Sequence, residues 1–87
     1  MKAQEIFDLA CRDFWLREIE QWVHNEMDRK MLIRRYLDGI CYEPLSESFD
    51  MTANNCEKRV EKARNQLFKH VKIEGIDDLE KYLVKKP

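Results

Sequence analysis

The chain has 87 residues, of which 44% are hydrophobic and 38% charged, and its net charge is −1. This length is typical of one domain, and the apolar content suffices for a small core, which argues against wholesale disorder. Two Gly and two Pro are too few for the turns of a β-sandwich or barrel, and no apolar run approaches the ~20 residues of a membrane span. Acidic residues follow the N-terminal Met-Lys closely, so no signal peptide is predicted and we expect a cytoplasmic protein.

The small net charge conceals an uneven distribution along the chain. Residues 1–28 carry three basic and seven acidic side chains, whereas residues 29–72 carry ten basic and six acidic ones. Residues 73–87 carry three basic and four acidic side chains. The middle segment is therefore the electropositive part, and we expect any surface for nucleic acid to lie there.

Cysteine and histidine positions do not indicate a metal or cofactor site. Cys11, Cys41 and Cys56 are odd in number and lack the C-x-x-C spacing, so we expect them to be small buried side chains in a reducing compartment. His24 and His70 lie far apart in the chain, and no other ligand residues cluster around them. The sequence predicts neither a bound metal nor a cofactor.

Residues 3–27 show the periodicity of one amphipathic helix, without an interrupting Gly or Pro. Apolar side chains recur at steps of three and four at Phe7, Cys11, Phe14, Trp15, Ile19, Trp22, Val23 and Met27. The favoured interpretation is a helix whose aromatic residues build the core of a small domain. The alternative is a second contact face, used for a partner protein or for a homodimer.

A second helix is predicted from Asp28, as its N-cap, to Leu37, and Gly39 should end it by adopting a left-handed conformation. The periodicity does not decide whether residues 3–37 form one bent helix or two. A short third helix is predicted over 42–49, with Pro44 in its first turn, where no helical hydrogen bond is lost.

The fourth predicted helix follows a tight turn at Asp50-Met51 and runs from Thr52, as N-cap, to about residue 71. Its buried stripe should consist of Cys56, Val60, Ala63, Leu67 and Val71. A last short helix is predicted over 76–84, with Leu79, Tyr82 and Leu83 pointing inward. The fold expected is thus all-α, a small bundle of four to five helices.

We treat residues 1–87 as a single domain in three parts. These are an aromatic N-terminal helix (1–27), a helix-turn-helix unit (28–72) and a short C-terminal helix with its tail (73–87). The unit consists of a short helix, a tight turn and a longer basic helix, an arrangement in which the last helix enters the major groove of DNA.

Residue types on the long helix and around it match the chemistry of DNA recognition. Asn pairs with adenine edges and Arg or Lys with guanine edges, while basic residues on flanking elements neutralise phosphates. We expect Thr52 to cap the helix and to contact a phosphate. The base-reading candidates are Asn54, Asn55, Lys58 and Arg59. The phosphate-neutralising candidates are Arg34, Arg35, Lys62 and Lys69.

Residues 34–67 resemble region four of bacterial sigma factors, whose pattern begins with Arg-Tyr-Leu-x-Gly and ends with Arg-Ala-Arg before a Leu. The matching positions are Arg35, Tyr36, Leu37, Gly39, Tyr42, Leu45, Phe49, Met51, Thr52, Arg59, Lys62, Ala63, Arg64 and Leu67. The departures are Cys41, Pro44, Ser46, Asp50, Asn55 and Cys56. The resemblance implies a divergent, free-standing sigma-like regulator, similar to the small activators of phages or mobile elements, with RNA polymerase as a further partner.

A rival hypothesis keeps this fold but assigns it a protein partner, such as RNA polymerase, and no DNA. Near-neutral charge favours that rival, because DNA-binding domains are often more basic. Charge placement should discriminate: a shared face for Arg34, Arg35, Lys58, Arg59 and Lys62 would favour DNA. Interruption of that face by Glu43, Glu47, Glu57 and Glu61 would favour a protein. No catalytic constellation is recognisable, so we do not expect an enzyme.

Overall fold

The computed structural model describes residues 2–73 and residue 79, and it confirms the all-α fold. The elements are α1 (Ala3–Phe7), α2 (Arg12–Trp22), α3 (Glu26–Leu32), the π-helix η1 (Ile33–Leu37), α4 (Tyr42–Ser48) and α5 (Ala53–His70). η1 continues α3 without a break. The last predicted helix, over 76–84, lies outside the described residues except for Leu79, which is fully buried.

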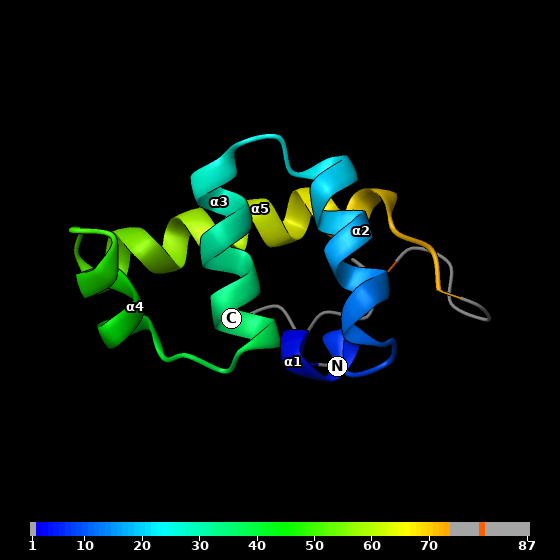
Figure 1. Ribbon diagram of the computed structural model, residues 1–87, viewed down its shortest axis with the longest axis horizontal. Helices are drawn as coiled ribbons and strands as arrows, with labels where there is room; N and C mark the ends of the chain where they lie inside the picture. Colours follow the sequence, from blue (N-terminus) through cyan, green and yellow to red (C-terminus); the bar gives the residue numbers. More distant parts are fainter. Residues whose placement is uncertain (1, 74–78, 80–87) are drawn as a thin grey trace.

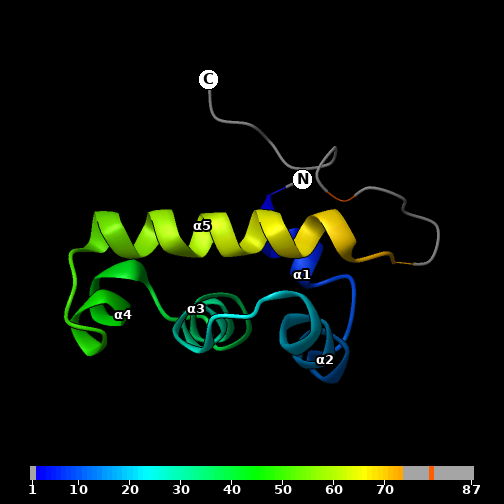
Figure 2. The same ribbon diagram turned by 90° about the horizontal axis from the view of Figure 1, so that it is seen from above.

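Helix α5 is the longest element and the one on which the others pack (Figure 1). Helices α2, α3 and α4 lie next to one another along a single side of α5 (Figure 2). The buried side of α5 consists of Cys56, Val60, Ala63, Leu67, Phe68 and the following Val71, so the predicted stripe is confirmed. Since burial of one apolar face stabilises a helix more than its intrinsic propensity does, this contact fixes the position of α5.

The first predicted helix, over 3–27, is wrong in its continuity, because the chain turns between α1 and α2. The indole Nε1 of Trp15 donates a buried hydrogen bond of 2.7 Å to the carbonyl oxygen of Phe7. In a continuous helix that oxygen would accept from the amide of Cys11. The turn also brings the rings of Phe7 and Trp15 to a centroid distance of 4.6 Å. The indole hydrogen bond of Trp15 therefore takes the place of one helical hydrogen bond.

A second interruption separates α2 from α3 at residues 23–25. Arg29 donates from Nη2 to the carbonyl oxygen of Glu20 at 2.8 Å and from Nε to that of Val23. It thereby satisfies carbonyl groups that the end of α2 leaves without helical partners. The predicted N-cap Asp28 is wrong: the cap is Asn25, whose Oδ1 accepts from the Asp28 amide at 3.1 Å.

Most aromatic side chains of residues 3–27 belong to the protein's own core. Phe7, Trp15 and Ile19 are at most 2% exposed, and the Phe7 ring stacks on that of Tyr36 at 4.6 Å. Phe14 and Trp22 are partly buried against the same core. The core interpretation is confirmed, and the side chains of the alternative, a contact face for a partner protein or a homodimer, are largely used inside the molecule.

The end of η1 has the left-handed glycine that the sequence predicts. Gly39 has φ +73°, and the amide of the following Ile40 donates to the Arg34 carbonyl oxygen at 3.0 Å. Gln4, from α1, donates from Nε2 to the Tyr36 carbonyl oxygen at 3.1 Å. These bonds satisfy carbonyl groups at the helix end, where helical donors are missing.

The expectation of three buried cysteines is wrong for two of them. Cys56 is fully buried on α5, but Cys11 and Cys41 are exposed. Both exposed residues occupy N-cap positions, Cys11 before α2 and Cys41 before α4. An N-cap residue lies outside the helical turn and faces solvent when its flanking turn does, which apolar periodicity does not reveal.

Candidate nucleic-acid interface

Helix α4, the turn after it and α5 form a helix-turn-helix arrangement. Asp50 has φ +55°, so it adopts the left-handed conformation predicted for the turn. The Thr52 hydroxyl accepts a hydrogen bond of 3.2 Å from the Asn55 amide and caps α5, as predicted. Ser46 is 4% exposed, and its hydroxyl donates to the Glu43 carbonyl oxygen at 2.8 Å, so a small polar residue is accommodated at this crossing.

The side of α5 turned away from the other helices carries three exposed lysines. Lys58, Lys62 and Lys69 follow one another at steps of four and seven, which places them along one line of the helix. This line, called the lysine ridge below, extends for about 17 Å at the helical rise per residue. It lies opposite the buried stripe and is therefore free of the contacts that hold α5 in place.

Asn54 and Asn55 are exposed in the first turn of α5, next to the lysine ridge. Their amide groups and the ammonium groups of the ridge thus share the solvent-facing side of one helix. Of the predicted base-reading and phosphate-binding residues, the fold brings together Asn54, Asn55, Lys58, Lys62 and Lys69.

Arg59 does not join this group, because its guanidinium turns toward α3. Nε and Nη2 lie 2.9 and 2.8 Å from Oδ1 of Asp28, and Nη1 lies 3.3 Å from the Met27 sulfur. Asp28 was not among the predicted site residues. It lies 31 positions from Arg59 in the chain, and no local pattern in the sequence signals such a pair.

Arg34 and Arg35 lie on η1 and not on α5, and both pack against aromatic rings. The Arg34 guanidinium lies over the Phe49 ring at 5.2 Å, and that of Arg35 lies over the Tyr42 ring at 4.7 Å. The Arg35 Nε atom is buried and has no hydrogen-bond partner among the described residues. Cation–π contacts therefore bind Arg35 into the fold, whereas Arg34 stays exposed.

Acidic residues border the lysine ridge rather than interrupt it. Glu57 and Glu61 are half-buried and, by helical geometry, lie on the flank of α5 opposite Arg59. Glu43 and Glu47 are exposed on α4. The five basic residues that were to share one face are thus divided between η1, the α3 side of α5 and the ridge. The arrangement expected for DNA binding is therefore met in part: Lys58 and Lys62 share an exposed face, while Arg34, Arg35 and Arg59 lie apart from it.

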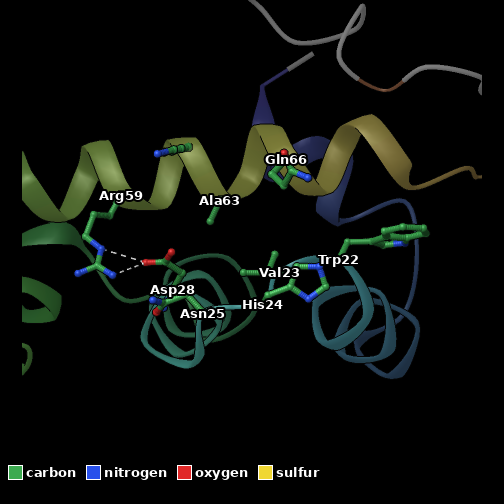
Figure 3. Close-up of a pocket in the computed structure, with 9 residues that line it drawn as sticks. Trp22, Val23, His24, Asn25, Asp28, Arg59, Ala63 and Gln66 are labelled. Atoms are coloured by element: carbon green, nitrogen blue, oxygen red, sulfur yellow. Dashed lines mark hydrogen bonds and ion pairs between the residues drawn. The ribbon is translucent and has the colours of Figure 1, made fainter.

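A groove of about 420 Å³ runs between α5 and the connection from α2 to α3. Val23 and Ala63 line it, and the Arg59–Asp28 ion pair lies at one end (Figure 3). Trp22 lines it at the other end, and its ring stacks on that of His70 at a centroid distance of 4.3 Å. The groove therefore adjoins the lysine ridge on its Arg59 side, with Lys62 common to both.

Two groups near these elements have perturbed acidity. Burial raises the pKa of the Tyr42 phenol, and the neighbouring Tyr36 raises it further, although Arg35 acts in the opposite direction. Burial likewise raises the pKa of the Cys56 thiol, partly offset by Arg59. Both groups are held neutral at pH 7, so neither is an activated nucleophile.

Two further features, a metal-binding cluster and a membrane-spanning helix, are not found within residues 2–73 and at residue 79. These residues contain no group of three His, Cys, Asp or Glu side chains arranged to hold a metal ion. None of their helices is long and apolar enough to span a membrane.

Comparison of the chain with models of protein families, with curated proteins and with solved structures finds no match.

Proposed function

We propose that the protein binds duplex DNA through α5 and acts as a helix-turn-helix regulator of transcription. The observation that carries this proposal is the lysine ridge, formed by three exposed lysines on a capped helix that follows a tight left-handed turn. The major groove, about 12 Å wide, admits one helix. In that position the outward side of α5 faces the bases and the adjacent phosphates.

Within this proposal the exposed residues have separate tasks. Asn54, Asn55 and Lys58 lie near the N-terminus of α5, the part of a recognition helix that contacts base edges. Lys62 and Lys69 lie farther along and are placed to neutralise phosphates. The resemblance of residues 34–67 to sigma region four supports the same role, with RNA polymerase as an additional partner and a cytoplasmic location.

The test measures the affinity of the protein for a pool of random duplex DNA. Fluorescence anisotropy gives this affinity at about 50 and 200 mM salt. The wild-type protein should bind at low salt and lose affinity steeply, because each phosphate contact releases counterions. The double variant Lys58→Ala/Lys62→Ala should bind about tenfold more weakly and, since Lys62 is the phosphate contact of the two, reduce the salt slope by about one.

A matched control is Arg17→Ala/Lys30→Ala, which removes the same charge from exposed positions on α2 and α3. This control should bind within about twofold of the wild type, since contact and not total charge determines the loss. Equal losses in the two double variants would contradict recognition by α5. Absence of binding at low salt by folded protein would overturn the proposal.

That last outcome would favour the second candidate, a protein-binding module of the same fold. Three observations support this candidate: the net charge of −1, the acidic border formed by Glu57 and Glu61, and the pairing of Arg59 with Asp28. Its test is titration of RNA polymerase with labelled protein in the absence of DNA.

A further inference from the structure

Arg59 lies on the flank of α5 between the lysine ridge and α3, but its guanidinium is directed toward α3 and not toward the ridge. Helical spacing puts Arg59 in one row with Asn55 and Lys62, which are four residues before it and three after it. Both of these neighbours are exposed, whereas the Arg59 guanidinium is held against α3 by Asp28. The row therefore has one basic residue that is withdrawn from the outward face.

The contact between Arg59 and Asp28 is well formed yet open to solvent. Two guanidinium nitrogens of Arg59 meet the same Asp28 oxygen at 2.8 and 2.9 Å. The side chains are 40% and 25% exposed, so water and salt ions reach both partners. Pairs with this exposure typically contribute about 1 kcal/mol or less, which makes exchange of the partner feasible.

We propose that Asp28 acts as an internal competitor for DNA: it holds Arg59 on α3, and a DNA phosphate must displace it before Arg59 binds. This inference rests on the proposed function. A phosphate oxygen is an equivalent acceptor for the guanidinium fork, so the exchange replaces one charge-assisted contact by another. The flexible arginine stem moves the guanidinium from the groove to the ridge side without any change in the backbone of α5. Asp28 thus lowers the affinity for DNA and limits nonspecific binding.

The central experiment is a double-mutant cycle on Asp28 and Arg59, with affinity for the same random duplex pool as the measured quantity. Asp28→Asn removes the competing charge but keeps the residue size and the backbone amide that Asn25 caps. We expect affinity to rise about two- to fivefold, the range set by the free energy of an exposed pair, and the salt slope to steepen by about one. In the Arg59→Ala background, Asp28→Asn should give no such gain.

The control is Glu26→Gln, in the same first turn of α3, which removes one negative charge without releasing Arg59. The Nζ atom of Lys30 lies 3.5 Å from Oε1 of Glu26, and the Lys30 side chain is already 57% exposed. Loss of the Glu26 charge therefore changes the position of Lys30 little. If Asp28→Asn and Glu26→Gln raise the affinity for DNA by the same factor, the inference is overturned, because the change in net charge alone would then explain the increase. A gain that persists without Arg59 would also overturn it.

Thermal unfolding of each variant separates this role from a purely structural one. If Asp28→Asn lowers the melting temperature and leaves DNA affinity unchanged in folded protein, the pair is structural and the inference is wrong. Asp28→Ala provides a second variant in which the side chain can no longer accept from Arg59. Failure of the proposed function is distinct, since the wild-type protein and every variant would then fail to bind DNA at low salt.

Discussion

The indole Nε1 of Trp15 donates its hydrogen bond to the backbone oxygen of Phe7, and this bond joins α1 to α2 together with the packing of the two rings. Trp15 is fully buried, and its ring also lies 6.0 Å from that of Phe68 on α5. One side chain therefore closes the first turn of the chain and attaches it to the central helix.

Trp15→Phe should reduce the free energy of unfolding by about 2–3 kcal/mol, because the Phe7 carbonyl loses its partner in a buried site and ring volume is lost. Urea denaturation measures this change. Trp22→Phe is the matched control: Trp22 is half-buried and bonds the Glu18 carboxylate instead, so its replacement should cost less than about 1 kcal/mol. If both variants lose the same free energy of unfolding, the hydrogen bond from Trp15 to the Phe7 carbonyl does not have the stabilising role assigned to it.

Gly39→Ala should destabilise the protein by about 1–2 kcal/mol through backbone conformation alone. Gly39 has φ +73°, but an added Cβ would meet no atom within 4 Å, so steric crowding by neighbouring groups is not involved. Asp50→Gly is the reciprocal variant at φ +55° and should leave stability unchanged or raise it by up to about 1 kcal/mol. A neutral Gly39→Ala in thermal unfolding would contradict this explanation.

Asn25→Ala should cost about 1 kcal/mol of stability, since the amide of Asp28 loses its capping acceptor. Asn25→Ser retains a capping oxygen and should recover most of that loss. Chemical denaturation of the two variants with the wild type provides the measurement. If Asn25→Ser is as destabilised as Asn25→Ala, the cap is not what holds the start of α3.

Stability should fall at alkaline pH because of Tyr42. Its pKa is raised in the folded protein, so the folded state retains this proton more firmly than the unfolded chain, whose tyrosines titrate near pH 10. The stabilisation is complete below about pH 10 and is lost as the pH rises above it. Tyr42→Phe should reduce the fall in unfolding free energy between about pH 10 and 11.

The Cys56 thiol adds a second alkaline contribution that begins at lower pH, because its ordinary pKa is 9.0 and burial raises it. Cys56→Ala isolates the effect of Tyr42 by removing this thiol. An alkaline slope that is identical with and without the Tyr42 hydroxyl, both measured in the Cys56→Ala background, would show that other groups cause it.

Local signals in the sequence were sufficient for the second half of the described fold. The Gly39 stop, the Asp50 turn, the Thr52 cap and the stripe from Cys56 to Val71 all appear where the residue types predict them. Each depends on the conformational preference of one residue or on the period of one helix, both of which are encoded within a few positions.

Only the tertiary structure decided where the N-terminal segment breaks and which basic residues face outward. The turn after Phe7 contains no Gly or Pro, and it exists because Trp15, eight residues later, replaces a helical donor. The direction of Arg59 depends on Asp28, 31 residues earlier, and that of Arg35 on Tyr42 across a turn. The spacing of apolar and charged residues along a chain determines which face of a helix is buried. A side chain that is long enough to reach a neighbouring helix finds its partner only through the packing of the whole domain.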